Sequence, residues 1–248
     1  MPTPEQLVTI RETLINTYAQ VGLWGEVRPA WPLPAGVTRG TDSHLAFLTL
    51  VYTISGGRDP VSLWQAARRT YAADLSLFDP QRLAYAKAPE LIEPLHHHGL
   101  TRKPTSEATI WQRIGQALVM RADGSVQKLL ANNQYDARRL LSMLGRSKAT
   151  FPVLSGEQTA PRWLYGLASE GQQPLLEAAS LPVPLSPTAA LALEGLGIQA
   201  RTVSAAVFAP LDALGRRGCE QRQPIQTLCP AARQCPVAQF CRFGHLAG

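Results

Sequence analysis

The stretch GRRGCEQRQPIQTLCPAARQCPVAQFC, residues 215–241, holds every cysteine of this chain. Cys219, Cys229, Cys235 and Cys241 follow one another with the spacing C-x9-C-x5-C-x5-C. Thiols confined to one short segment rich in Arg and Pro are expected to act together. Four sulfurs this close in sequence either ligate one metal centre or pair as two disulfides.

The cellular compartment decides between these two uses of the thiols. The N-terminus, MPTPEQLVTIRETL, lacks the basic region and apolar core of a secretory signal. No apolar run in the sequence reaches the roughly 18 residues that a membrane span needs. We therefore expect a cytoplasmic protein with no membrane partner, in which the reducing environment disfavours disulfides and favours metal ligation.

The gaps between the cysteines favour an iron–sulfur cluster over zinc, although an all-sulfur ligand set permits either. Zinc sites usually use paired C-x2–4-C knuckles, whereas the shortest gap here is five residues. Wider gaps let the chain wrap a larger object, and a 4Fe-4S cube takes one thiolate for each iron. We expect a 4Fe-4S cluster on the four cysteines, with zinc as the alternative.

The composition is that of a folded, moderately basic protein. Of the 248 residues, 45% are hydrophobic and 17% are charged, which suits one large domain or two small ones and excludes a disordered chain. The formal net charge is +6. Because such an excess occurs both in nucleic-acid-binding proteins and in basic proteins with no such partner, charge alone leaves both open.

The hydrophobic pattern predicts an all-α chain. Leu7, Ile10 and Leu14 recur at helical spacing near the N-terminus. Asp42 or Ser43 is a suitable N-cap, and other caps and prolines mark further helix starts. No apolar–polar alternation is long enough to build a sheet. Helices are expected at residues 4–22, 42–55, 60–73, 79–87, 88–97, 105–121, 125–131, 135–145, 187–195 and 199–217.

The cysteine segment resembles the endonuclease III group of helix-hairpin-helix DNA glycosylases, whose chains close with an iron–sulfur loop, typically G-R-x-x-C-x6-C-x2-C-x5-C. Gly215-Arg216 precedes Cys219 with the family spacing, and Cys235-Pro236 followed by Cys241 repeats the closing C-P-x4-C. The two middle gaps depart from the family, x9 and x5 in place of x6 and x2, so the loop must be shaped differently.

The rest of the chain resembles the family in order. HLAFLTLVYTISGGRD (44–59) is similar to its buried helix and DNA-intercalating turn. IEPLHHHGLTRKPTSEATIWQRIGQAL (92–118) is similar to its Gly-Leu-x-x-x-Lys turn and following helix. LLSMLGRSKATFPVLSGEQTAPRWLYGLA (140–168) is similar to its hairpin.

This resemblance implies an all-α fold with two lobes. One lobe, residues 25–180, is expected to be a helical barrel that contains the helix-hairpin-helix at about 140–168. The other is expected to combine residues 1–24 with 181–248 and to carry the cluster. We expect a monomer that binds double-stranded DNA.

The hairpin is expected to bind a DNA phosphate. A glycine turn between two helices lets backbone N–H groups point outward beside a helix N-terminus, which binds phosphate without reading sequence. The competing interpretation is an ordinary capping turn, with Ser155 as N-cap and Gln158 as the N3 partner of a capping box. The phosphate-binding residues expected here are Val153, Leu154, Ser155, Gly156 and Thr159.

Basic residues outside the hairpin also fit DNA contacts, and each has a second interpretation. Arg58 stands where the family inserts a side chain into the duplex, yet it also fits an exposed loop arginine. Arg102 and Lys103 fit phosphate contacts and equally fit turn-capping cations. Arg216 can contact phosphate or offset the negative charge of a thiolate-ligated cluster.

The family's two catalytic positions hold residues that cannot do the family's chemistry. Aligning GEQTA with GRKTA puts Gln158 at the Schiff-base Lys, and an amide nitrogen is not nucleophilic. Ser186 stands at the family's Asp, and serine cannot supply a fixed negative charge to an oxocarbenium-like sugar. Schiff-base lyase activity is therefore not expected, and any glycosylase is expected to be monofunctional.

Several functions stay open. The chain can be a DNA repair glycosylase that uses another carboxylate, for which Glu157 is a candidate and equally a solvated surface residue. It can be a monofunctional enzyme with weak activity on labile bases. It can be a catalytically silent 4Fe-4S DNA-binding module that senses lesions or DNA structure, or a zinc-stabilised helical interaction protein.

Overall fold

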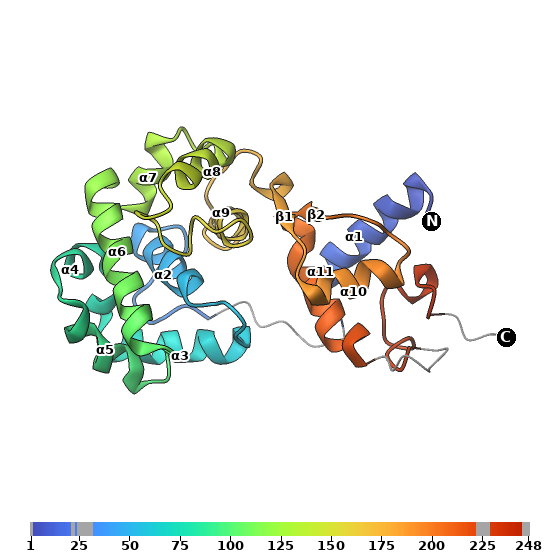
Figure 1. Ribbon diagram of the computed structural model, residues 1–248, viewed down its shortest axis with the longest axis horizontal. Helices are drawn as coiled ribbons and strands as arrows, with labels where there is room; N and C mark the ends of the chain where they lie inside the picture. Colours follow the sequence, from blue (N-terminus) through green and yellow to red (C-terminus); the bar gives the residue numbers. More distant parts are fainter. Residues whose placement is uncertain (1, 21–22, 24–31, 222–228, 245–248) are drawn as a thin grey trace. The chain divides into compact units, whose positions relative to one another are not determined.

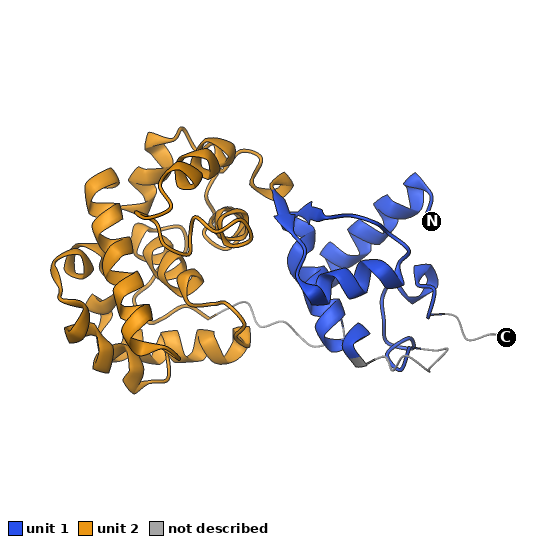
Figure 2. Cartoon of the chain, in the orientation of Figure 1, with its two compact units in different colours: residues 1–30, 182–248 blue, residues 31–181 orange. Residues whose placement is uncertain are grey.

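The computed structural model describes residues 2–20, 23, 32–221 and 229–244, and within them the chain is predominantly helical, as expected (Figure 1). The chain forms two compact units, Met1–Ala30 with Pro182–Gly248 and Trp31–Leu181, called unit 1 and unit 2 (Figure 2). The lobe boundary expected between residues 24 and 25 lies outside the described residues.

The elements of unit 2 are α2 (Asp42–Thr53), α3 (Pro60–Ala73), η1 (Leu75–Phe78), α4 (Pro80–Tyr85), α5 (Ala88–His97), α6 (Pro104–Ala122), α7 (Val126–Asn132), α8 (Ala137–Arg146), α9 (Thr159–Ser169) and η2 (Ala178–Ser180). Those of unit 1 are α1 (Pro4–Gln20), β1 (Pro182–Pro184), α10 (Pro187–Gly195), β2 (Thr202–Ser204), α11 (Ala205–Arg217), η3 (Cys219–Gln221) and η4 (Ala238–Phe240).

Unit 2 is built around α2, because that helix is apolar on nearly every side. Nine of its twelve residues are buried, and α6, α7 and α9 pack against it. Its N-cap is Thr41, one residue earlier than expected, whose hydroxyl accepts a hydrogen bond from the His44 N–H. Asp42 is instead the first helical residue, where its negative charge favours the helix N-terminus.

Aromatic side chains fill the centre of unit 2. Phe47 of α2 stacks on Phe78 with ring centroids 5.1 Å apart and meets Trp64 edge-on at 5.2 Å. Trp111 of α6 meets the other side of Phe78 at 5.1 Å. Trp163 of α9 is fully buried and donates its indole N–H to the Thr49 hydroxyl at 3.0 Å. These contacts tie α2, α3, α6 and α9 into one core.

His44 is a buried titratable group within this core. It is fully buried, and its Nδ1 accepts a hydrogen bond from the Gly40 N–H at 3.1 Å. Burial, helped by the nearby charge of Arg39, lowers the pKa of His44 to about 4. The imidazole is therefore neutral near pH 7, with its proton on Nε2, which has no hydrogen-bond partner among the described residues.

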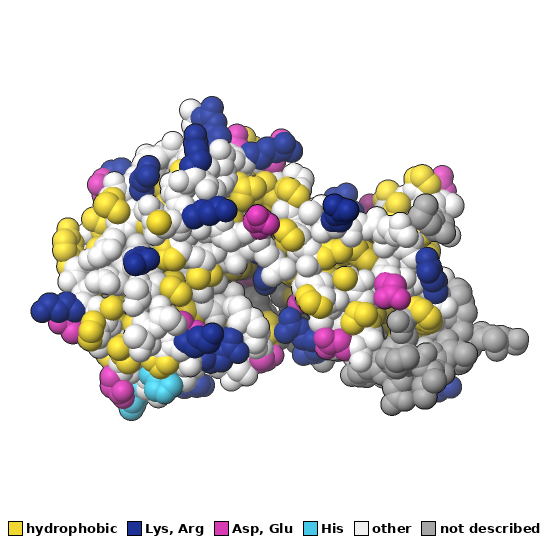
Figure 3. Space-filling model, viewed as in Figure 1, with side chains coloured by type: hydrophobic (Ala, Val, Ile, Leu, Met, Phe, Trp, Pro, Cys, Tyr) yellow, Lys and Arg dark blue, Asp and Glu magenta, His cyan; other side chains and the backbone are white. Residues whose placement is uncertain are grey.

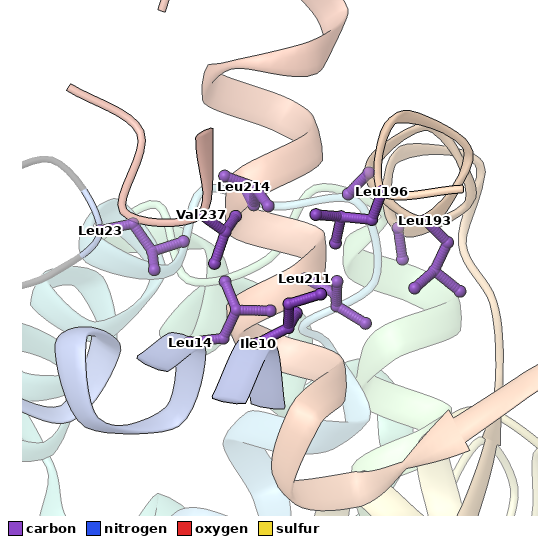
Figure 4. Close-up of a cluster of buried hydrophobic side chains, with 10 residues drawn as sticks. Ile10, Leu14, Leu23, Leu193, Leu196, Leu211, Leu214 and Val237 are labelled. Carbon is purple, nitrogen blue, oxygen red and sulfur yellow. The ribbon is translucent and has the colours of Figure 1, made fainter. Parts of the chain in front are cut away.

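The core of unit 1 forms where α1, α10 and α11 meet (Figure 4). Ile10 and Leu14 of α1 pack against Leu211 and Leu214 of α11, and Leu193 of α10 joins the same cluster. All five side chains are buried. α1 is thus far from α10 and α11 in sequence but shares their core.

α10 and α11 approach each other closely at Gly215. A Cβ atom at this position would lie 1.9 Å from the carbonyl oxygen of Thr188. A distance that short is impossible for two non-bonded atoms, so only glycine permits this crossing.

The expected helix at 199–217 is wrong at its start. Thr202–Ser204 forms strand β2, which pairs antiparallel with β1, with Val183 opposite Val203. β-branched Thr202 and Val203 favour an extended backbone, and the prolines of β1 are tolerated in a two-stranded edge. α11 begins at Ala205. The N-terminal helix ends at Gln20, and the remainder of its expected span, residues 21–22, lies outside the described residues.

Within the described part of the chain, no helix is both long enough and apolar enough to cross a membrane.

Candidate metal centre and nucleic-acid contacts

All four cysteines line one cavity at the edge of the unit 1 core. Ala192 of α10, Leu196 just after that helix and Leu214 of α11 form part of its wall. The other described residues that line it are alanine, valine or glycine, so among the described side chains only the cysteines present a strong ligand atom there. The interior that a water-sized group can enter is small, about 20 Å³.

Short turns bring the sulfurs to this cavity. Cys219 follows the C-terminus of α11, where the Gly218 N–H closes the helix on the Leu214 carbonyl at 2.9 Å. The Ala232 N–H bonds to the Cys229 carbonyl at 3.0 Å, and the Ala238 N–H bonds to the Cys235 carbonyl at 3.2 Å. Each six-residue step from one cysteine to the next therefore contains a turn that returns the chain to the cavity.

Two glycines let the cysteine loop lie against the end of α10. A Cβ at Gly195 would be 3.2 Å from the Cys241 sulfur, and the Gly195 carbonyl accepts the Arg242 N–H at 2.8 Å. Gly197 has φ +70°, and a Cβ there would be 3.0 Å from Nε of Arg242. A Cβ at Gly195 would require the Cys241 sulfur to move by a few tenths of an ångström, whereas at Gly197 the positive φ is what disfavours other residues.

All four cysteines are partly exposed, and the Cys235 thiol is the one whose titration shows the effect of burial. Burial raises the pKa of the Cys235 thiol to about 11, the N–H of Val237 opposes this, and the neighbouring Cys241 and Cys229 add to it. A thiolate is therefore unfavourable there without a cation to compensate it, and metal binding is the usual source of such compensation.

The cysteines and apolar residues of the cavity are chemically compatible with an iron–sulfur cluster. Across the described residues, no three His, Cys, Asp or Glu side chains are close enough together to hold a single metal ion. A tetrahedral zinc site would need all four sulfurs about 2.3 Å from one centre. An iron–sulfur cube places its four cysteine ligands on four different irons, and an apolar, all-sulfur lining suits it.

A polar network joins α10 to α11 just before the cysteine loop. The Asp212 carboxylate accepts hydrogen bonds from the hydroxyls of Ser186 and Thr188, the first at 2.5 Å, and from the Arg216 guanidinium at 2.6 Å. Burial alone would raise the pKa of Asp212, but these donors outweigh it and hold that pKa below its usual value. Arg216, expected to contact DNA, is thus already engaged by a carboxylate.

The hairpin residues do not present their amides as expected. The N–H groups of Leu154, Ser155 and Gly156 donate to the carbonyls of Pro152, Phe151 and Val153, at 2.8, 3.0 and 3.0 Å. The expectation that these three amides point outward is therefore wrong, because the turn satisfies itself. Leu154 is also fully buried.

The capping interpretation of this turn is wrong as well. α9 begins at Thr159 and its N-cap is Gln158, with no side-chain capping bond. Ser155 instead donates its hydroxyl to the Lys148 carbonyl at 3.3 Å. Val153 has φ +66°, a left-handed conformation that a β-branched residue rarely adopts, and its side chain is exposed. In the described residues, no acceptor pairs with the N–H of Val153 or Thr159.

Arg58 and Arg102 join two turns of unit 2, an arrangement we call the arginine clasp. Arg58 donates to the carbonyls of Gly99, at 3.0 Å, and Leu100. Arg102 donates in the opposite direction, to the carbonyls of Gly56 at 2.5 Å and Gly57 at 3.2 Å.

The clasp shows what the basic residues of these turns contact within the chain. Its acceptors follow the C-termini of α2 and α5, where cations are favourable. Burial, with a contribution from Arg102, lowers the pKa of Arg58, and Glu107 opposes the shift. The carboxylate of Glu107 accepts the backbone N–H groups of Arg102 and Lys103 at 2.8 and 3.3 Å. The Lys103 side chain is exposed.

The candidate catalytic positions lie in different units. Gln158 and exposed Glu157 belong to unit 2, whereas Ser186 belongs to unit 1. Ser186 is the N-cap of α10, and its hydroxyl accepts the Ala189 N–H at 3.1 Å while donating to Asp212.

Sequence reasoning missed Asp212 and Glu107. An Asp four residues before Arg216 is a common helical pair, and Glu107 stands in the first turn of α6, so both had a local explanation. No local pattern predicts that Asp212 also reaches Ser186, 26 residues away.

Basic side chains are spread over the surface drawn in Figure 3 and are interspersed with acidic ones. No protein-family model matches this sequence, and no curated protein is similar enough to count as a match.

Proposed function

We propose that this chain is a DNA repair protein similar to endonuclease III, which carries a 4Fe-4S cluster and probes or excises damaged bases in duplex DNA. The observation that carries the proposal is the convergence of all four cysteines on one apolar cavity. In a chain with no other cysteine, this points to a shared inorganic group rather than to separate thiols.

The cluster would be held by Cys219, Cys229, Cys235 and Cys241. It would brace a loop that otherwise rests on short turns and on contacts with α10. When bound, the cluster supplies a rigid link between four points of the loop and can exchange electrons.

Contact with duplex DNA is supported by the net charge of +6 and by basic turns with rigid backbones. The arginine clasp holds two turns of unit 2 together, and Lys103 extends from one of them. Val153 and Thr159 keep backbone N–H groups available beside the N-terminus of α9. Such donors bind phosphates without reading sequence.

Base excision would have to be monofunctional. Hydrolysis of an N-glycosidic bond needs water as the nucleophile and a negative charge near the developing sugar cation. Gln158 cannot form a Schiff base, and Ser186 carries no charge. Glu157 is an exposed carboxylate beside the turn of the hairpin and is our candidate to supply that charge.

A second function is favoured by specific contacts. Ser186 is occupied as a helix cap and as a donor to Asp212, and three hairpin amides are satisfied within their own turn. These groups are used for structure, which suits a catalytically silent 4Fe-4S module that binds DNA to sense lesions or structure.

The first experiment combines three measurements on the purified chain. Iron and acid-labile sulfide would be quantified, with zinc measured on the same sample. Base release would be followed on duplex oligonucleotides carrying a panel of lesions, with alkali to cleave abasic sites. Duplex binding would be measured from low to high salt.

Each measurement answers one part of the proposal. Iron and sulfide near four atoms of each per chain support the cluster, whereas stoichiometric zinc without iron refutes it. Base release that Glu157→Gln abolishes supports the enzyme. Silence across the panel with intact binding supports the sensing module. A binding constant that does not change with salt would refute any phosphate-contacting function.

A further inference from the structure

Asp212 is the carboxylate that fastens α10 to α11. One of its oxygens accepts the hydroxyls of Ser186 and Thr188, and the other accepts Arg216 at 2.6 Å. The two hydroxyls are themselves 2.9 Å apart, and Ser186 also caps α10 through the Ala189 N–H. We call these four side chains the polar latch.

The latch is built to hold a negative charge. The Asp212 side chain is only 16% exposed, so its charge is stable only because three donors surround it. The hydroxyl donors come from the N-terminus of α10, whose dipole also favours an anion. Arg216 lies one turn further along α11 and is about half exposed. A neutral amide in place of the carboxylate would accept these bonds less strongly.

The latch lies next to the closest contact between the two helices. Thr188 supplies both a hydroxyl to Asp212 and the backbone carbonyl that faces Gly215. Gly215 permits the helices to approach, while the latch prevents them from sliding along each other. A slip of one residue would move one helix by about 1.5 Å relative to the other.

The same two helices form the wall of the cysteine cavity. Ala192 of α10, Leu196 at its C-terminal cap and Leu214 of α11 line it, and Cys219 follows α11 two residues after its end. Cys241 rests on Gly195, the last residue of α10. Two of the four sulfurs are therefore placed from different helices, and the distance between them depends on how α10 and α11 are aligned.

We propose that Asp212 is a positioning residue for the cluster: the polar latch fixes the alignment of α10 and α11 and thereby the spacing of Cys219 and Cys241. This inference rests on the proposed 4Fe-4S site. Ligand geometry must be held to within a fraction of an ångström, and groups that orient ligands affect metal retention strongly.

The test measures cluster release from the purified holoprotein. An excess of an iron chelator is added, and loss of the cluster's visible absorbance is followed for the wild type and for Asp212→Asn. The matched control is Asp136→Asn in unit 2, because Asp136 is likewise a carboxylate that accepts hydrogen bonds within the chain, from the N–H groups of Arg138 and Arg139 at 2.8 and 3.0 Å. Visible circular dichroism of each holoprotein reports the cluster's surroundings.

We expect Asp212→Asn to release the cluster about tenfold faster and to change its visible dichroism. Asp136→Asn should do neither, because it also replaces a hydrogen-bonded carboxylate by an amide but in the unit that lacks the cysteines. The double variant Ser186→Asp with Asp212→Ser restores a carboxylate–hydroxyl pair across the helices, with Asp as a good N-cap, and should slow release toward the wild-type rate.

Several results would overturn the inference. Equal release rates in Asp212→Asn and Asp136→Asn would show that the latch acts only on general stability. If Asp212→Asn does not fold, Thr188→Val removes one donor and leaves the ion pair; unchanged release and dichroism there would equally reject the latch. A wild-type protein without iron and sulfide would refute the proposed cluster itself, whereas a normal cluster with no effect of the latch would refute this inference alone.

Discussion

Replacing Gly215 with alanine should destabilise unit 1 more than the addition of a single methyl group suggests. The added Cβ would lie 1.9 Å from the Thr188 carbonyl oxygen and 2.4 Å from its carbon, both backbone atoms that cannot rotate away. Ordinary contact begins near 3.4 Å. The difference, 3.4 minus 1.9, means that α10 and α11 must separate by roughly 1.5 Å, which would loosen the packing of Leu193 against Leu211.

The magnitude follows from two opposing effects. Overpacking a core costs about 1–3 kcal/mol, and a backbone clash belongs at the upper end of that range, near 3 kcal/mol. Alanine is the better helix former by about 1 kcal/mol. The net loss of stability is then about 2 kcal/mol. Gly145→Ala in α8 is the matched control, because nothing lies within 4 Å of its added Cβ. That variant should be neutral or stabilised by up to about 1 kcal/mol.

Urea unfolding gives the overall free energies, and hydrogen exchange resolved by peptide assigns them to a unit. Protection should fall in α10 and α11 of Gly215→Ala while α2 and α6 of unit 2 stay protected. The reasoning would be refuted by a Gly215→Ala protein as stable as the wild type. It would also be refuted if Gly145→Ala were equally damaging, since the close approach at Thr188 could not then be the cause.

Three further outcomes are expected. In urea unfolding, the wild type should lose at most about 3 kcal/mol of stability as pH falls from 6.5 toward 4, because His44 binds a proton in the unfolded chain but not when buried, where its pKa is lowered to about 4. His44→Gln should lack this loss of stability, and equal pH profiles for the two proteins would contradict the prediction. Arg102→Ala should speed hydrogen exchange at residues 56–58 and 99–101, because the clasp loses its bonds to Gly56 and Gly57, and Lys103→Ala should leave exchange there unchanged; the opposite pattern would disprove the clasp. Lys103→Ala should lower the salt dependence of duplex binding by about one ion, and Lys128→Ala, whose ammonium pairs with Asp123, should not.

Helix caps, prolines at helix starts and apolar runs predicted the helices well in much of the chain. Pro60 stands in the first turn of α3 behind the cap Asp59, and the apolar run of α2 is buried as its composition demands. The prediction was wrong at the start of α11. Thr202–Ser204 was expected to be helical, but its β-branched Thr202 and Val203 favour an extended backbone, and pairing with Pro182–Pro184 makes it a strand.

In the candidate site, too, some features were predictable from the sequence and others depend on contacts between residues distant in sequence. The clustering of the cysteines along the chain is evident from the sequence, since their role depends on residue type and spacing. The hairpin amides were mispredicted because the turn folds back on Pro152 and Phe151, with Val153 in a left-handed conformation that its residue type disfavours. Arg58 and Arg102 looked like exposed cations, yet each reaches carbonyls more than 40 residues away. The conformational propensity of a residue gives no information about which distant carbonyl its side chain contacts.

The four cysteines line one cavity although two of the gaps between them, x9 and x5, are longer than in the glycosylases that the segment resembles. Five residues lie between Cys229 and Cys235 and five between Cys235 and Cys241, and each of these two segments contains a turn rather than an extended strand. The turns bring every cysteine back to one cavity, and Gly195 admits Cys241 against α10. The positions of the sulfurs therefore depend on helix packing as much as on spacing, so substitutions at Gly215 and Asp212 should change the geometry of the cysteines.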